Sequence, residues 1–205
     1  MKIIAVGMNY AAHNEELHAG MARPEEPVIF LKPDSALLRD GKPFFLPDFS
    51  QEIHYETELV VRVSRLGKNI AERFAHRYYD AVTVGIDFTA RDLQRRFRAA
   101  GAPWELSKGF DGSAAIGTFV PMEYFQNIQN VRFHLDIDGK TVQCGCTCDM
   151  LFTVDQVIAY VSRFMTLKMG DLIYTGTPVG VGPVSIGQHL QGYLEGERVL
   201  DFYIR

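Results

Sequence analysis

The 205-residue sequence lacks a run of about 18 apolar residues, the length that a transmembrane helix requires. Its first ten residues turn polar too soon for a signal peptide. No cluster of Lys and Arg offsets the formal net charge of −4, and the locally basic stretch of Arg91, Arg95, Arg96 and Arg98 is typical of a solvated helix face. We therefore expect a cytoplasmic protein with neither a membrane nor a nucleic acid as partner.

Cysteine is scarce, and the three that occur, Cys144, Cys146 and Cys148, lie close together. An odd number at this spacing is unlike a disulfide framework. In a strand, residues two apart share a face, so three thiols could in principle hold a soft metal. Neither an obvious fourth ligand nor the usual two-residue gap of a zinc knuckle is present. We interpret them as small buried side chains of a strand, with no metal or redox role.

No internal repeat, low-complexity tract or linker divides the chain, so one domain over residues 1–205 is expected. Hydrophobic patterns predict strands at 2–6, 28–32, 55–63, 81–88, 131–138, 141–148, 172–174 and 199–204, with a hairpin turn at Asp138-Gly139. Helical segments are predicted at 9–17, 69–79, 91–100 and 153–164, the last opened by a capping box of Thr153 and Gln156. Many short strands and few helices indicate a β-rich α+β fold rather than a doubly wound sheet.

Three carboxylates form a candidate metal site. In the strand 55–63, Glu56 and Glu58 share one face, about 6–7 Å apart along the chain, and Leu59 anchors the opposite, apolar face in a core. Taken alone, such a pair is typical of a solvated face, because like charges repel unless a cation or protons compensate. A third carboxylate, Asp87, ends an apolar strand, where functional groups are often presented. Three carboxylates with open positions suit Mg²⁺ or Mn²⁺.

Two further segments contain candidate catalytic groups. His13 and Glu16 are three residues apart, so on a helical turn they share a face, and the carboxylate can orient the imidazole as a general base. Taken alone, this pair is more typical of an exposed helix face. Later, the small residues of Thr175-Gly176-Thr177-Pro178 let backbone N–H groups approach a carboxylate. The nearby Gly180-Val181-Gly182 lacks a third glycine, which argues against nucleotide binding.

Taken in order, these segments resemble the fumarylacetoacetate hydrolase family, most closely its short acylpyruvate hydrolase and oxaloacetate decarboxylase branch. The matching residues are Gly7-Met8-Asn9-Tyr10, His13, Glu16, Phe30-Leu31-Lys32-Pro33, Tyr55-Glu56-Thr57-Glu58-Leu59, Asp87-Phe88-Thr89-Ala90-Arg91-Asp92, Gln94, Pro103-Trp104, Lys108, Asp111, Met150-Leu151-Phe152, Gly170-Asp171, Thr175-Gly176-Thr177-Pro178 and Gly180-Val181-Gly182. Two departures are Met8, where the acylpyruvase branch often carries arginine, and Gly112-Ser113-Ala114-Ala115, which lacks a proline frequent there.

The resemblance implies a mixed β-sandwich roll, a homodimer and a divalent ion, commonly Mg²⁺ and alternatively Mn²⁺ or Ca²⁺. It implies that the ion is bound by Glu56, Glu58 and Asp87. It also implies that Lys108 and Gln94 line the site, that Lys32 lies near it, and that Thr177 helps to hold the substrate carboxylate. His13 and Glu16 would form a catalytic dyad on a mobile lid over the site. Lys108 is included among the catalytic candidates.

The substrate expected from this chemistry is a small 2-oxo acid, whose carboxylate and carbonyl oxygen together chelate one ion. The ion acts as a Lewis acid toward the pyruvate enolate, which is common to several reactions. Our leading hypothesis is a hydrolase that cleaves a carbon–carbon bond in a 2,4-dioxo acid of the acylpyruvate or fumarylacetoacetate type, with His13 activating water. The alternative is an oxaloacetate decarboxylase or a 2-oxo acid tautomerase, followed by an isomerase or hydratase of aromatic degradation. A non-catalytic dicarboxylate-binding module is the remaining hypothesis, although a binder needs no base.

Overall fold

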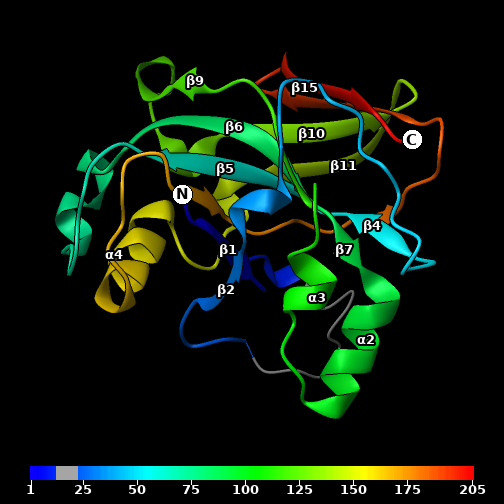
Figure 1. Ribbon diagram of the computed structural model, residues 1–205. Coiled ribbons are helices and arrows are strands. Elements are labelled where there is room, and N and C mark those ends of the chain that lie inside the picture. The colour runs from blue at the N-terminus through cyan, green and yellow to red at the C-terminus, as the bar shows by residue number, and fades with distance from the viewer. Residues whose placement is uncertain (13–22) are drawn as a thin grey trace.

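The computed structural model describes residues 1–12 and 23–205, and their strands form three sheets (Figure 1). The largest sheet has the order β2 (Val28–Lys32), β1 (Ile3–Gly7), β12 (Leu172–Tyr174), β5 (Thr57–Val63), β6 (Tyr79–Asp87), β8 (Ala114–Ile116) and β3 (Leu37–Leu38), with β9 (Val120–Pro121) paired to β6. The second contains β11 (Lys140–Cys146), β10 (Arg132–Ile137), β14 (His189–Leu194) and β15 (Glu197–Tyr203). The third contains β13 (Gly182–Pro183), β4 (Ile53–Tyr55) and β7 (Thr89–Ala90). The predicted β-rich α+β class is confirmed.

The main hydrophobic core lies between the largest sheet and the four-stranded sheet, in which β10 contacts β5 while β14 and β15 contact β6. β5 and β6 contribute Leu59, Val61, Val82 and Val84, all of them fully buried. The facing sheet contributes Phe133, Leu135, Leu190 and Leu200 to the same cluster. β-branched residues pack well on a pleated surface, which explains why the valine-rich segments form the two central strands.

Three α-helices of the described chain cover the edges of these sheets: α2 (Arg91–Ala100), α3 (Glu105–Lys108) and α4 (Val154–Phe164). α2 has the predicted bounds and ends at Gly101, whose φ of 63° suits a residue without a side chain. The predicted capping box of Thr153 and Gln156 opens α4. Within the described residues, no helix is long and apolar enough to cross a membrane. Figure 1 shows α2 and α3 together at one end of the molecule, next to β7.

The pairing of β5 with β6 positions the candidate site. The strands are antiparallel, with Thr57 opposite Ile86 and Glu58 opposite Gly85. Beyond this ladder, the Asp87 N–H donates to the Glu56 carbonyl oxygen at 2.8 Å. The register therefore places Glu56, Glu58 and Asp87 at the same end of the central strand pair.

Three predicted elements differ from the structure. The strand predicted at 55–63 is interrupted at Glu56, because the chain leaves the third sheet after β4 and enters the largest sheet at β5. The helix predicted at 69–79 is a 3₁₀ helix, Glu72–Arg77, in which only Ala75 is buried. The strand predicted at 141–148 ends at Cys146, and the 3₁₀ turn Thr147–Asp149 follows.

Candidate active site

Three carboxylates converge at the end of the β5–β6 pair. Glu56 lies between β4 and β5, Glu58 is on β5, and Asp87 is the last residue of β6. Only 6%, 2% and 0% of their respective surfaces are exposed. One oxygen from each lies within 4.8 Å of the other two. The arrangement predicted for a metal site is therefore present, inside the protein rather than on a solvated face.

The ammonium group of Lys108, at the end of α3, reaches two of the carboxylates. Its Nζ donates to Glu56 Oε2 at 2.8 Å, to Asp87 Oδ2 at 2.8 Å and to Thr89 Oγ1 at 2.7 Å. Burial would lower the pKa of Lys108, but the negative charges of Asp87 and Glu56 outweigh it and raise this pKa above its ordinary value. Lys108 is therefore a protonated donor in this site rather than a base.

A second buried ammonium, Lys32 at the end of β2, lies on the other side of Asp87. Its Nζ is 2.5 Å from Asp87 Oδ1 and donates to the Ser113 carbonyl oxygen at 3.0 Å and to the Lys108 carbonyl oxygen. Burial lowers the pKa of Lys32, the Asp87 charge opposes that effect, and Lys108 adds to it. The sequence placed Lys32 near the site, and the structure places it against Asp87.

Glu58 differs from the other two carboxylates in its partners. Glu56 and Asp87 form ion pairs with lysine or arginine, whereas the ion pairs of the described residues do not include Glu58. Its Oε2 accepts a hydrogen bond from the Gly176 N–H at 2.6 Å. Burial, followed by the charges of Asp87 and Glu56, raises the pKa of Glu58 well above its ordinary value. The charge of Lys108 acts on Glu58 as well, but it does not outweigh burial and the two neighbouring carboxylates.

The donor set fits a hard divalent cation. Three carboxylates supply oxygen ligands only, which Mg²⁺ and Mn²⁺ prefer over softer donors. Asp87 Oδ1 is buried with the Lys32 ammonium as its ion-pair partner, and a carboxylate oxygen with one such partner keeps a second lone pair for a cation. A cation beside Glu58 would also give this carboxylate a positively charged partner in direct contact. The roles of the three residues as ligands remain predictions.

One face of α2 forms a wall of the pocket beside the carboxylates. Arg91, Gln94 and Arg98 lie three and four residues apart, so they share this face, and all three line the pocket. Arg91 donates to Glu56 Oε1 at 2.6 Å and to Gln94 Oε1 at 2.6 Å. Arg91 is 5% exposed, so the interpretation of this basic stretch as a solvated face is wrong at Arg91, although Arg95, Arg96 and Arg98 are exposed. A buried guanidinium needs its acidic partner, which the sequence alone does not pair with it.

Thr177 also lines this pocket. Its hydroxyl donates to the Thr57 carbonyl oxygen at 2.9 Å and accepts from Gln143 Nε2 at 2.8 Å. Gln143 also accepts from the Thr57 N–H at 3.0 Å, so it ties the start of β5 to the segment that contains Thr177. The hydroxyl proton of Thr177 is committed to Thr57, and contact of Thr177 with a substrate carboxylate remains a prediction.

The glycine before Thr177 is fixed by a close approach of the N-terminal segment. Gly176 has a φ of 101°, and a Cβ atom there would lie 2.7 Å from the Asn9 Cβ. Asn9 Nδ2 donates to the Thr175 carbonyl oxygen at 2.8 Å and to the Phe152 carbonyl oxygen at 3.0 Å. Asn9 therefore links three parts of the chain next to the hydrogen bond that Gly176 makes to Glu58.

The predicted dyad of His13 and Glu16 lies outside the described residues, so its role stays a prediction. Four residues that hold the centre together were not assigned roles from the sequence: Thr89, Arg91, Ser113 and Gln143. In the sequence, each of the four is a polar residue that lies within or next to an apolar strand, or at the start of a helix. That signal becomes informative only after the fold shows which polar groups are buried.

The interpretation of the cysteines as small buried thiols is wrong. Cys144 and Cys148 are exposed, Cys146 is half-buried, and a disulfide joins Cys146 to Cys148. The chain turns after Cys146 because the buried Thr147 hydroxyl accepts from the Val131 N–H at 2.8 Å and donates to the Ile128 carbonyl oxygen at 2.7 Å. The turn brings the Cα atoms of Cys146 and Cys148 to 5.2 Å, a separation that a disulfide can span.

The fold and the buried carboxylate–lysine centre can be compared with known proteins. The family model described as the C-terminal domain of fumarylacetoacetate (FAA) hydrolase matches residues 2–201. The chain therefore belongs to the fumarylacetoacetate hydrolase family, is an enzyme of that family, and has its mixed fold of curled sheets with few helices.

Three proteins to which this chain is similar illustrate the activities of its relatives. The protein from Arabidopsis thaliana named oxaloacetate tautomerase FAHD1, mitochondrial, is 42% identical over 201 residues, which are 98% of this chain and 89% of that protein. The mitochondrial oxaloacetate decarboxylase from Dictyostelium discoideum is 42% identical, with 95% of this chain and 89% of that protein covered. The crystal structure of fumarylpyruvate hydrolase from Pseudomonas aeruginosa in complex with Mn²⁺ and pyruvate has a TM-score of 0.93 and 34% identity, covering 100% of this chain and 89% of that one.

Proposed function

We propose that the protein is a divalent-metal-dependent enzyme that acts on a small 2-oxo acid, with Mg²⁺ or Mn²⁺ held by Glu56, Glu58 and Asp87. The observation that carries the proposal is the burial of these three carboxylates with one oxygen from each within 4.8 Å of the others. A bound ion supplies positive charge against the oxygen atoms of the 2-oxo acid as negative charge develops there. The Mn²⁺ and pyruvate in the structure of the Pseudomonas aeruginosa hydrolase support this choice of ligand and ion.

The side chains around the carboxylates suit an anionic substrate. The protonated Lys108 places a positive charge beside Glu56 and Asp87, where it can stabilise developing charge on a substrate oxygen. On the wall formed by α2, Gln94 and Arg98 present a second group of donors. A four-carbon dicarboxylate such as oxaloacetate has one carboxylate for the ion and a second for this wall.

Oxaloacetate tautomerisation is the first candidate reaction. Interconversion of enol and keto forms moves a proton between carbon and oxygen, so it needs a group or water molecule that carries the proton and charge stabilisation at the 2-oxo group, but no water that attacks carbon. Lys108 and the three carboxylates that would hold the ion lie among the described residues. The tautomerase and decarboxylase names of the two 42% identical relatives support the same substrate.

Carbon–carbon hydrolysis of a 2,4-dioxo acid is the second candidate, favoured by the Pseudomonas aeruginosa structure and by the His13 and Glu16 pair in the sequence. This reaction needs a base to take a proton from water, and imidazole titrates near neutral pH. His13→Ala should therefore lower hydrolysis by about 10²–10⁴-fold, and oxaloacetate turnover much less. Glu16→Ala should cause a smaller loss, because it removes orientation rather than the base. Hydrolysis at the parent rate by the His13 variant would show that this dyad is not the base.

A substrate panel with controlled metal tests the proposal. The protein is stripped with EDTA, and turnover of oxaloacetate, fumarylpyruvate and acetylpyruvate is measured before and after addition of Mg²⁺, Mn²⁺ or Ca²⁺. We expect no turnover without metal and recovery with Mg²⁺ or Mn²⁺. Full activity in excess EDTA, or no turnover of any 2-oxo acid with any of the ions, would contradict the proposal.

The homodimer and the cytoplasmic location remain predictions. The homodimer rests on the resemblance to the family, and light scattering on the purified chain would test it. The cytoplasmic location is an expectation from the sequence, whereas two of the relatives above are named as mitochondrial. Fractionation of cells that produce the natural protein would test it.

A further inference from the structure

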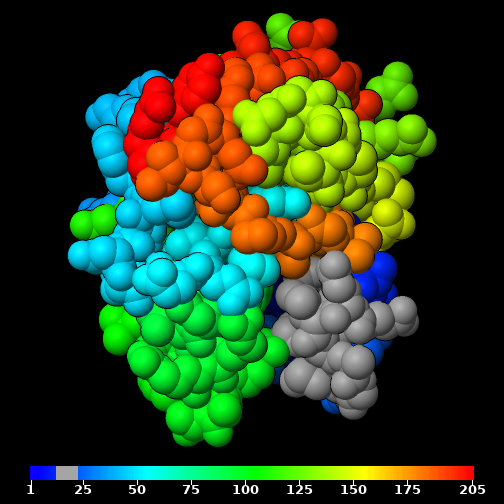
Figure 2. All heavy atoms as spheres, turned by 90° about the vertical axis from the view of Figure 1, so that its right-hand side faces the viewer, coloured from blue at the N-terminus to red at the C-terminus, as the bar shows by residue number. Residues whose placement is uncertain are grey.

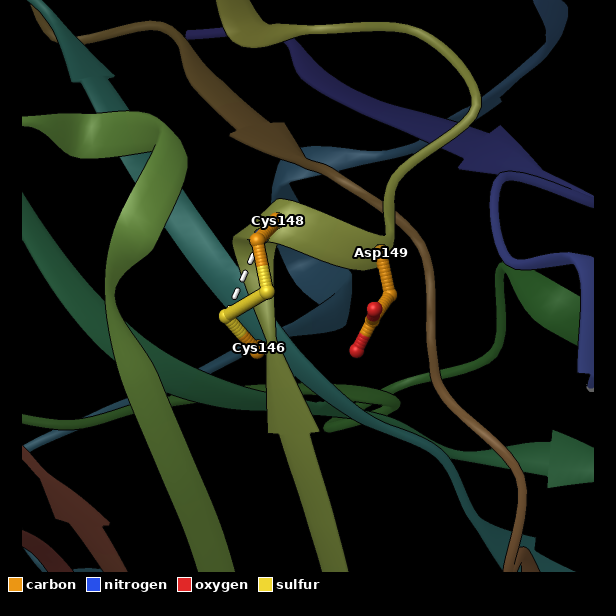
Figure 3. Close-up of side chains that lie close together, drawn as sticks. All are labelled: Cys146, Cys148 and Asp149. Carbon is orange, nitrogen blue, oxygen red and sulfur yellow. Dashed lines mark hydrogen bonds between the residues drawn. A yellow bond between two sulfur atoms is a disulfide. The ribbon is translucent and has the colours of Figure 1, made fainter.

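The disulfide at the end of β11 is accessible from solvent. Figure 3 shows Cys146 at the end of the strand, Cys148 in the turn that follows, and Asp149 beside them. Cys148 is exposed and Cys146 is half-buried. In Figure 2 the yellow-green residues of the β10–β11 hairpin form part of the visible surface. A thiolate from solvent can therefore reach the bridge, and Cys148 is the more exposed of the two residues.

The bridge is poorly suited to stabilising the fold. A disulfide stabilises mainly by restricting the unfolded chain, and this effect grows with the number of residues in the closed loop. Here only Thr147 separates the two cysteines. Exposed disulfides that contribute little to folding are the ones that undergo exchange.

The surroundings satisfy Cys146 in the reduced form as well. The Cys148 N–H points at Cys146 Sγ at 3.2 Å, and this bond stabilises negative charge on that sulfur. Cys146 Sγ also lies 3.7 Å from Asn130 Oδ1, which can accept a hydrogen bond from the thiol after reduction. A good leaving thiolate and a satisfied thiol are both features of a reversible dithiol pair.

The residues that follow the bridge hold the N-terminal segment in place. Met150 pairs with Tyr10, and the Leu151 N–H donates to the Asn9 carbonyl oxygen at 2.8 Å. The Phe152 N–H donates to Asn9 Oδ1 at 2.7 Å. As described above, Asn9 in turn contacts the segment whose Gly176 N–H binds Glu58. Only a few residues thus separate the bridge from the carboxylate centre.

Tyr10, which pairs with Met150, lies close enough to both regions for their charges to act on it. Burial raises the pKa of the Tyr10 hydroxyl well above its ordinary value, and the negative charges of Glu58 and Asp149 add to this effect. One side chain therefore experiences both a carboxylate of the centre and the carboxylate next to Cys148. The turn Thr147–Asp149 therefore lies close enough to Tyr10 for the charge of Asp149 to act on its hydroxyl.

We propose that Cys146 and Cys148 form a reversible thiol–disulfide exchange site, and that the oxidised form braces the contact of residues 150–152 with Asn9 and Tyr10. The reductant is a dithiol. One of its thiolates attacks Cys148 Sγ, the Cys146–Cys148 bond breaks, and Cys146 leaves as a thiolate that takes up a proton. The second thiolate of the reductant then attacks the mixed disulfide and releases Cys148. Two electrons pass to the protein, and the dithiol becomes a disulfide.

Thiol labelling tests the exchange. The full-length protein is incubated with glutathione disulfide or with dithiothreitol, freed of reagent, and treated with a maleimide before mass measurement. We expect one labelled cysteine in the oxidised form, Cys144, and three in the reduced form. Cys144→Ser is the matched control, because it removes an exposed thiol two residues away and leaves the bridge intact. Three labelled thiols in the parent protein after oxidation would overturn the proposal.

Hydrogen exchange and turnover test the bracing. Protection of the Leu151 and Phe152 amides should fall by about tenfold on reduction, because their hydrogen bonds to Asn9 open more often. kcat/KM should fall by about threefold or more as the centre loses its fixed geometry. Cys144→Ser should respond like the parent, whereas Cys148→Ser should behave as the reduced form with either reagent. Equal amide protection in the two forms would overturn the bracing.

The turnover measurement rests on the proposed function, whereas thiol labelling and hydrogen exchange do not. If labelling and exchange follow the expected pattern while neither form turns over any 2-oxo acid, the proposed function fails and the exchange site stands. If both forms turn over substrate at the same rate with unequal amide protection, the brace does not reach the carboxylate centre, and that part of the proposal is overturned.

Discussion

Two groups of potential metal ligands lie within residues 1–12 and 23–205, and they differ in burial and in the charges around them. Glu56, Glu58 and Asp87 are buried among lysine and arginine side chains, whereas Cys146, Cys148 and Asp149 lie in a turn at the surface. In both groups the candidate ligand atoms are within 4.8 Å of one another. Proximity alone therefore does not distinguish a metal centre from a cluster with another role.

Burial gives the first group its significance. Carboxylates removed from water are costly unless positive charge compensates them, and Lys32, Lys108 and Arg91 lie against Glu56 and Asp87 but not against Glu58. The exposed cysteines carry no such cost, because water solvates either of their oxidation states. The comparison supports the two proposals, a bound cation at the buried group and reversible bond exchange at the exposed one.

The largest expected effect comes from removing a carboxylate of the buried group. Glu58→Gln should lower kcat/KM by about 10³-fold or more, because the ion contributes several kcal/mol of charge stabilisation and each 1.4 kcal/mol is about tenfold in rate. Mn²⁺ affinity, followed by calorimetry, should fall in parallel. Glu52→Gln is the matched control, since Glu52 pairs with the exposed Arg95 away from the pocket. A Glu58 variant with parental metal affinity and rate would remove the distinction between the two groups.

Lys32→Met should destabilise the protein by about 3–5 kcal/mol, the usual cost of removing one partner from a buried ion pair. The cause is Asp87 Oδ1, which lies 2.5 Å from Lys32 Nζ with both side chains buried. Arg62→Gln, which breaks the exposed pair with Asp80, should cost only about 0.2–1 kcal/mol. Urea unfolding of both variants without metal measures the difference, and equal costs would mean that burial does not set the energetics of the centre.

Arg98→Met should raise KM for oxaloacetate by about 10- to 100-fold with a smaller change in kcat, the loss expected for one hydrogen bond to a charged group. Arg98 lines the pocket on the same helix face as Gln94, at the position proposed for the second carboxylate. The control substrate is acetylpyruvate, which has no second carboxylate. Equal losses on both substrates would show that Arg98 does not select dicarboxylates.

The smallest effect is expected at the cysteines. The triple change of Cys144, Cys146 and Cys148 to Ser should keep turnover within about twofold of the reduced parent, because surface substitutions usually change free energies by about 0.5 kcal/mol or less. Mn²⁺ affinity should be unchanged. Loss of metal binding in a variant with a normal circular dichroism spectrum would place the ion at the cysteine turn instead.

Local rules explain which elements could be predicted from the sequence. The bounds of α2 follow from Gly101 at its end, and the start of α4 follows from its capping box. β14 was not predicted, because its outward-facing residues are polar and it contains Gly192, which packs against Leu200 and Val84. Such a strand is defined by its neighbours rather than by its own composition.

The candidate site could be predicted only in part, for a related reason. The spacing of Glu56 and Glu58 and the position of Asp87 at a strand end indicated a shared site, which the structure brings together. The burial of Arg91 depends on Glu56, which lies 35 residues earlier. The cysteine disulfide depends on the hydrogen bonds that turn the chain at Thr147. Long-range pairings of this kind leave no local pattern in a single sequence.

Anomalous diffraction from crystals soaked in Mn²⁺ is the most direct test of the contrast between the two groups. We predict one strong anomalous peak among the carboxylates of Glu56, Glu58 and Asp87, and none beside Cys146, Cys148 and Asp149, in both oxidised and reduced crystals. Absence of density among the three buried carboxylates, or a peak at the cysteine turn, would contradict the assignment of the metal centre.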